Sequence, residues 1–158
     1  MKIHHLLGAM CLCFGIGTLS AQNYQKTSSG IRTTVNAVDI EVQFFAPAVV
    51  RVIKSPEGVA YAKQSLSVIA KPEEVHFKTA IKDNRIVLNS SDLSICVDTR
   101  TGVVSYLSKS GKTLLTEKNG VQFTPFDDAG TKTLQVYQPF ILDKEEAIYG
   151  LGQLQNGK

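Results

Sequence analysis

Apolar and polar residues alternate strictly over much of the chain, and this pattern restricts those segments to extended strands. In residues 38–44, Val, Ile, Val and Phe alternate with Asp, Glu and Gln, and residues 93–98 repeat the pattern. Because successive side chains of a strand point to opposite faces, such a segment buries one face and exposes the other. No stretch of ten residues has convincing 3.6-residue spacing, so the sequence predicts an all-β fold.

Turn residues separate the predicted strands. Residues 82–84, 98–102 and 108–112 are rich in Asp, Asn, Ser and Gly, and the last two carry a glycine suited to the positive φ of a hairpin loop. Many short strands with frequent turns favour an antiparallel β-sandwich or barrel, and we predict the sandwich. Further strands are predicted at residues 31–35, 49–53, 66–69, 75–81, 85–88, 103–107, 113–115, 121–123 and 134–137.

Residues 1–21 have the three regions of a secretory signal peptide. A short positive start precedes the apolar residues 6–19, and the segment ends on the small residues Ser20 and Ala21. The apolar run is shorter than the roughly 20 residues that a membrane-spanning helix needs. We therefore predict cleavage after Ala21, export to the periplasm or the extracellular space, and no membrane segment in the mature chain.

The charge balance and the scarcity of cysteine and histidine argue against nucleic-acid binding and metal binding by the mature chain. The whole chain has 17 Lys and Arg against 14 Asp and Glu, and no basic run exceeds a dipeptide. This near balance gives no support to nucleic-acid binding. After removal of residues 1–21, Cys96 and His76 are the only cysteine and histidine. We expect no internal disulfide, no metal site and no cofactor.

The sequence contains no recognisable catalytic motif. Gly-x-Ser-x-Gly, Walker and His-Glu-x-x-His patterns do not occur. Glycoside cleavage needs two carboxylates at one bond, whereas adjacent residues of an extended chain point apart. The acid pairs at 127–128 and 145–146 are therefore interpreted as surface acids, His76 as a solvated strand residue, and Cys96 as a half-buried sheet residue. No catalytic residue is predicted within the chain.

A motif near the end of the chain resembles a known family. Residues 147–153, Ala-Ile-Tyr-Gly-Leu-Gly-Gln, resemble the Tyr-Gly-Leu-Gly signature of glycoside hydrolase family 31, which includes α-glucosidases and α-xylosidases. Residues 93–102 resemble an alternating strand of that family with its acidic turn and glycine, and residues 49–52 resemble its early Val-Arg-Val strand. Gln153 replaces the usual Glu, and the Gln-x-Gln form looks closer to bacterial α-xylosidase-like members.

The resemblance implies a domain organisation. Residues 22–146 would form a galactose-mutarotase-like β-sandwich, and residues 147–158 would be a junction leading to an absent catalytic (β/α)8 barrel. The parent would be a retaining α-glycosidase whose catalytic aspartates lie past Lys158. We therefore expect the chain to be a fragment, with that barrel as its partner. Specific junction residues are Tyr149, Gly150, Gly152 and Gln153.

The resemblance also implies that the sandwich docks on the barrel and shapes the rim of its oligosaccharide pocket. Residues 126–131 are predicted to be a polar loop, and residues 123–131 are the candidate rim because they carry aromatics, acids and a glycine. The rim candidates are Phe126, Asp127 and Asp128. Two alternatives remain open at this point, a free-standing carbohydrate-binding sandwich and a purely structural β domain; the chain has no Trp for the former.

Overall fold

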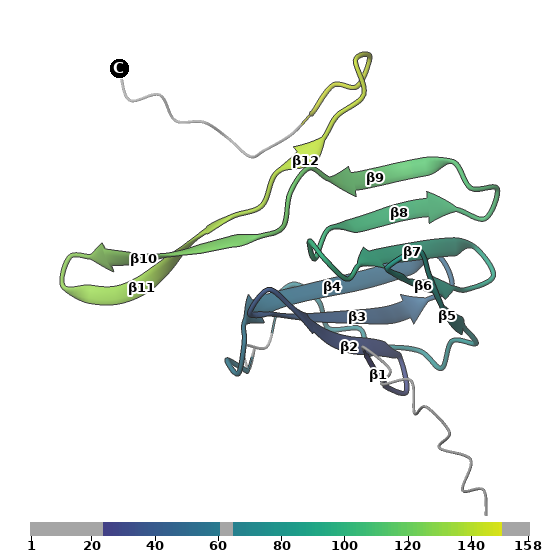
Figure 1. The fold of residues 1–158 in the computed structure, drawn as a ribbon, viewed down its shortest axis with the longest axis horizontal. Coiled ribbons are helices and arrows are strands. Elements are labelled where there is room, and N and C mark those ends of the chain that lie inside the picture. The colour runs from purple at the N-terminus through teal and green to yellow at the C-terminus, as the bar shows by residue number, and fades with distance from the viewer. Residues whose placement is uncertain (1–23, 61–64, 150–158) are drawn as a thin grey trace, which may run out of the picture.

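The computed structural model describes residues 24–60 and 65–149 (Figure 1). None of these residues belongs to a helix long and apolar enough to cross a membrane. The predicted signal peptide lies outside the described residues. The strands within the described ranges are β1 (Gln25–Lys26), β2 (Gly30–Val35), β3 (Val38–Ala46), β4 (Val49–Pro56), β5 (Lys78–Lys82), β6 (Arg85–Asn89), β7 (Leu93–Asp98), β8 (Val104–Ser108), β9 (Thr113–Glu117), β10 (Gln122–Asp128), β11 (Thr131–Tyr137) and β12 (Phe140–Ile141).

The first sheet has the order β1-β2-β3-β4, with every neighbouring pair antiparallel. The alternation predicted for residues 38–44 is confirmed, because Ile40, Val42 and Phe44 are buried while the residues between them are only partly so. Gly30 permits the close approach of β2 to β3. A Cβ at this position would lie 1.8 Å from the carbonyl oxygen of Val42, which no side chain can tolerate.

The second sheet has the order β12-β9-β8-β7-β6-β5 and is also antiparallel throughout. Strands β5 to β9 follow one another as a meander, and the chain then leaves the sheet before β12 returns to pair with β9. The amide of Lys118 donates to the carbonyl of Pro139 at 3.0 Å, directly beside this β9–β12 pair. The point of departure and the point of return are therefore hydrogen-bonded to each other.

A single hydrophobic core joins the two sheets, as expected for a sandwich. β2 and β3 contribute one side of it, and β6, β7 and β8 contribute the other. Burial of these aliphatic and aromatic side chains is the main source of stability in a chain of this composition. The structure confirms the predicted all-β antiparallel sandwich. The core residues are Ile31, Val35, Ile40, Val42, Phe44, Val75, Ile86, Leu88, Ile95, Val97 and Val104.

Two predicted strands in the connection between β4 and β5 are wrong or too long. Residues 66–69 form no strand, and the Leu66 side chain is 99% exposed. Residues 75–77 precede β5 rather than belonging to it, so His76 is a solvated residue of an irregular segment. Both segments have strand-forming composition, but the structure gives them no neighbouring strand with which to pair.

The polar loop predicted at residues 126–131 is wrong as well. Phe126, Asp127 and Asp128 belong to β10, which pairs with β11 along its whole length, and only residues 129–130 form the turn. Figure 1 shows this two-stranded hairpin projecting away from the two sheets. We call residues 122–137 the arm. The Asp-Asp pair and Pro125 disfavour strand by composition, yet the cross-strand ladder holds them extended.

Candidate functional site: the arm and its root

The tip of the arm is a tight two-residue turn. Ala129 and Gly130 have φ of 48° and 89°, the left-handed region in which glycine is favoured and alanine is strained. The amide of Gly130 donates to Oδ1 of Asp127 at 2.7 Å, so this carboxylate is used to fix the turn. Asp127 therefore has a structural role at the tip, whichever further contacts it makes.

The structure brings the three rim candidates together at this tip but does not place them on one side. Phe126 pairs across the hairpin with Thr133, Asp127 with Lys132, and Asp128 with Thr131. Because side chains alternate along a strand, Phe126 and Asp128 share one face and Asp127 lies on the other. All three are exposed, as predicted for surface acids in the case of Asp127 and Asp128.

Large apolar side chains are exposed along the arm and along the segment that follows it. Phe126 is 51% exposed and Tyr149 is 89% exposed, and several large apolar side chains between them in the sequence are exposed as well. We call this set the exposed apolar series. Exposed apolar surface of this extent is typical of an interaction site. The junction residues Gly150, Gly152 and Gln153 lie outside the described residues. The other members of the exposed series are Leu134, Val136, Tyr137, Phe140, Ile141, Leu142 and Ile148.

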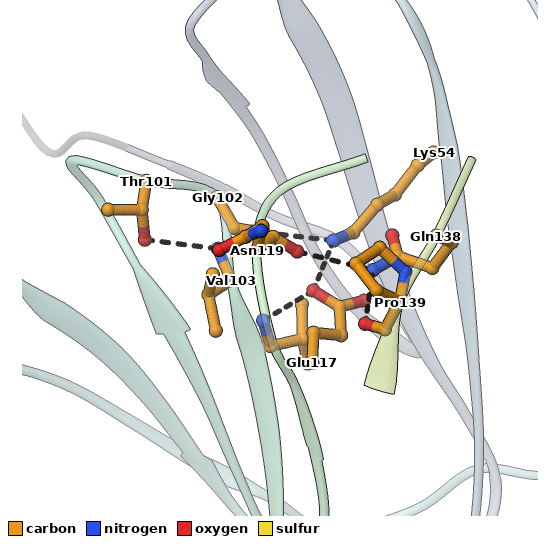
Figure 2. Close-up of polar contacts among 9 residues, drawn as sticks. Lys54, Thr101, Gly102, Val103, Glu117, Asn119, Gln138 and Pro139 are labelled. Carbon is orange, nitrogen blue, oxygen red and sulfur yellow. Dashed lines mark hydrogen bonds and ion pairs between the residues drawn. The ribbon is translucent and has the colours of Figure 1, made fainter. Parts of the chain in front are cut away.

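A buried ion pair lies at the root of the arm and connects the two sheets (Figure 2). Nζ of Lys54, on β4, lies 2.5 Å from Oε2 of Glu117, on β9, and the two side chains are 8% and 3% exposed. Lys54 also donates to the carbonyl of Gly102 at 2.9 Å, and the amide of Val104 donates to Oε2 of Glu117 at 2.7 Å. These contacts satisfy charges that burial would otherwise make costly.

Gln138 is the residue at which the arm rejoins the sandwich. Its Nε2 donates to the carbonyls of Asn119 and Pro139, both at 3.3 Å (Figure 2). The bond to Asn119 joins the segment that leaves the arm to the segment that enters it. Its Oε1 is shielded from solvent and has no hydrogen-bond partner among residues 24–60 and 65–149. The root is therefore a polar cluster that holds the two ends of the arm together.

The pair also acts on a neighbouring tyrosine. Burial raises the pKa of Tyr106 to about 12, and the negative charge of Glu117 adds to the increase because a second anion nearby is unfavourable. Sequence reasoning did not find Lys54 or Glu117. A signal was available, since Lys54 follows Val50 and Val52 at period two and therefore occupies an inward position of β4.

A concave region lies beside the β2–β3 hairpin. This groove of about 720 Å³ is bordered by Arg32, Asp39 and Glu41 among others. Its charged groups are bonded to neighbouring side chains: Arg32 donates to Glu41 at 3.1 Å, and Thr34 donates to Asp39 at 2.6 Å. The hydrogen bond from Thr34, with a further one from the amide of Gly58, lowers the pKa of Asp39. The three charged side chains are therefore engaged in contacts within the domain.

The remaining candidates are structural. Among residues 24–60 and 65–149, no group of three or more His, Cys, Asp and Glu could hold a metal ion. Cys96 is half-buried in β7, as predicted, and burial raises the pKa of its thiol, which keeps it protonated and unreactive. The acids Glu145 and Glu146 are exposed, in agreement with their interpretation as surface acids.

Comparison with known proteins adds two findings. Residues 39–157 match the family model described as the glycosyl hydrolase 31 N-terminal galactose mutarotase-like domain. The fold is similar to the crystal structure of the GH31 α-xylosidase from Xanthomonas citri, with a TM-score of 0.74 and 26% sequence identity over 83% of this chain. The chain spans 15% of the length of that α-xylosidase.

Proposed function

The chain belongs to the glycosyl hydrolase 31 N-terminal galactose mutarotase-like domain family, and from that premise we propose that it serves a longer α-glycosidase as a non-catalytic docking domain. One similar protein of known structure is an α-xylosidase, and this chain spans 15% of its length. The catalytic barrel is the proposed partner, and carbohydrate breakdown of the α-xylosidase or α-glucosidase type is the proposed activity of the whole protein.

The exposed apolar series on residues 126–149 is the observation that supports docking. Apolar side chains that protrude from a sandwich gain free energy when a partner removes them from water, at about 25 cal/mol for each Å². The arm projects beyond the two sheets and so extends the reach of the domain (Figure 1). We propose that the arm and the segment after it lie against the barrel, with the tip at the rim of the sugar pocket.

Substitution on the arm tests this docking in the full-length protein. Leu134→Asp places a charge on an exposed apolar position of β11, where it leaves the core of the sandwich untouched. We expect the sandwich and the barrel of the variant to unfold in separate thermal transitions, and activity to fall at least fivefold. Ile81→Asp, at a similarly exposed position on β5 (50% against 43% for Leu134), is the matched control and should behave like the parent.

Two outcomes would contradict the proposal. In one, Leu134→Asp matches the parent in both melting and activity. In the other, the gene product ends at Lys158 and has no catalytic domain to dock on.

We further propose that the protein is exported. The support is the arrangement of residues 1–21, with a positive start, an apolar run and small residues at the end. N-terminal sequencing of the product from the periplasm or the medium should begin at Gln22. Recovery of an exported chain that retains Met1 would contradict cleavage, and recovery from the cytoplasm alone would contradict export.

A further inference from the structure

The segment that enters the arm contains the dipeptide Asn119-Gly120. Asn119 is exposed and lies in the bend that follows β9, and its backbone carbonyl accepts from Nε2 of Gln138 at 3.3 Å (Figure 2). Among residues 24–60 and 65–149, neither the side-chain amide of Asn119 nor the backbone amide of Gly120 has a hydrogen-bond partner. These two adjacent groups are therefore available to each other.

Packing explains why residue 120 is a glycine. A Cβ at this position would lie 2.7 Å from the carbonyl oxygen of Thr101, so the chain can approach the turn between β7 and β8 this closely only without a side chain. The lack of a Cβ also leaves the amide nitrogen of Gly120 open to the side chain that precedes it. The fold thus requires the residue type that makes an asparagine before it most reactive.

We propose that Asn119 is a site of spontaneous deamidation in the folded protein. The amide nitrogen of Gly120 loses its proton and bonds to Cγ of Asn119, and the Cγ–Nδ2 bond breaks as Nδ2 takes up a proton and leaves as ammonia. Water then opens the resulting succinimide ring at either of its two carbonyl carbons. One opening leaves aspartate, and the other leaves isoaspartate, in which the main chain continues through Cβ and Cγ.

Isoaspartate at position 119 changes the root of the arm in two ways. The main chain gains a methylene group directly before Gly120, which already lies too close to Thr101 to tolerate a Cβ. The carbonyl that accepts from Gln138 becomes a free carboxylate, so this hydrogen bond no longer holds the main chain that continues into the arm. The hydrophobic core has no member among residues 118–139, so deamidation loosens the arm and leaves the core intact.

Timed incubation of the full-length protein in mildly alkaline buffer, which favours loss of the amide proton, tests the site. We expect the peptide that contains Asn119 to gain about 1 Da and to separate into aspartyl and isoaspartyl forms. The peptides that contain Asn36 and Asn89 are internal controls and should keep their mass. Neither residue precedes a glycine, and their side-chain amides are bonded to the carbonyl of Arg100 and the hydroxyl of Ser94.

The same protein unfolded in urea gives the reference rate, because the fold then no longer restrains the peptide. A rate in the folded protein within about tenfold of the rate in urea supports the proposal. A slower rate would overturn it, since the fold would then protect Asn119.

Asn119→Gln is the matched variant for the effect on the arm, because its longer side chain closes a six-membered ring far more slowly. After equal incubation, the Lys118 amide, which donates to Pro139, should exchange its hydrogen about tenfold faster in the parent than in the variant. Equal exchange would overturn the loosening of the arm. Neither measurement reads activity, so both outcomes are independent of the proposed docking.

Discussion

At the scale of single residues, Lys54 and Glu117 bring two charges into the interior where the sheets meet. Removing a charge from water costs several kcal/mol, and the attraction between the two offsets this only when their other hydrogen-bonding sites are also filled. The carbonyl of Gly102 and the amide of Val104 fill one such site on each side chain. The pair therefore contributes a fixed geometry at the root of the arm more than it contributes net stability.

Breaking this pair from one side should be costly. Lys54→Met or Glu117→Leu alone leaves the other charge buried without its partner, and we expect each to lower the free energy of unfolding by about 3–5 kcal/mol. The double variant should recover more than half of that loss, because no uncompensated charge remains. Urea unfolding of the four proteins gives the coupling energy. Additive losses in the double variant would show that the two side chains do not interact.

The raised pKa of Tyr106 predicts a loss of stability at alkaline pH. The folded protein holds the phenolic proton to about pH 12, whereas an unfolded tyrosine releases it near pH 10. Stability from this group is therefore fully present below pH 10 and is lost as the pH rises towards 12. A pKa shift of two units corresponds to roughly 2.7 kcal/mol. Because the Tyr106 ring is partly exposed, we expect a smaller loss of stability, of about 1–2 kcal/mol.

Tyr106→Phe isolates this effect from the titration of other tyrosines and of lysines. The free energy of unfolding, measured in urea at pH 9 and at pH 11.5, should fall less in the variant than in the parent. An equal fall in the free energy of unfolding of both proteins would contradict the raised pKa of Tyr106.

At the scale of elements, the strands that bury one face were predicted more completely than the segments outside the core. Residues 38–44 and 93–98 show strict alternation because their inner side chains pack in the sandwich. Residues 66–69 have similar composition, yet they form no strand, since strand formation depends on a neighbour that the local sequence does not encode. Strands were predicted at the two ends of the arm, residues 121–123 and 134–137, but residues 126–131 were predicted to be a loop. Cross-strand pairing, and not composition, keeps residues 126–128 extended.

The turn between β2 and β3 offers a test of local strain. Asn36 and Ala37 have φ of 51° and 58°, as a two-residue hairpin turn requires, and alanine is strained in that region. Ala37→Gly should relieve the strain and raise the free energy of unfolding by about 0.5 kcal/mol after the entropic cost of glycine. Ala129→Gly makes the same change in the arm and serves as the control.

We expect Ala129→Gly to have a smaller effect on global unfolding, because the arm carries almost none of the core. Denaturant unfolding of both variants gives the comparison. A decrease in stability for Ala37→Gly would show that the turn is not strained.

At the scale of the whole molecule, the sequence showed that Phe126, Asp127 and Asp128 are neighbours, but it did not show how their side chains are arranged. Phe126, Asp127 and Asp128 do lie together at one exposed tip. Their division between two faces follows from the register of β10 and β11, which depends on a two-residue turn at 129–130 where a longer loop was predicted. Lys54 and Glu117 are 63 residues apart in the chain, and no local pattern connects them.

Removal of the arm should leave the sandwich intact. We expect a variant without residues 121–137, in which Gly120 is joined to Gln138, to keep its free energy of unfolding within about 1 kcal/mol of the parent. The reason is that the amide of Lys118 already bonds to the carbonyl of Pro139, so a short hairpin loop can close there. Circular dichroism and urea unfolding provide the measurement, and loss of the cooperative transition would contradict the expectation.

The same hydrogen bond between Lys118 and Pro139 has a consequence for how such a domain evolves. The arm has the character of an insertion between two strands that are already neighbours, so codons can be added or lost there without altering the order or register of either sheet. Lineages can therefore lengthen, shorten or reshape the arm while inheriting the same sandwich. Selection on the function proposed for the arm can act on this one short stretch of the gene without altering the core of the domain.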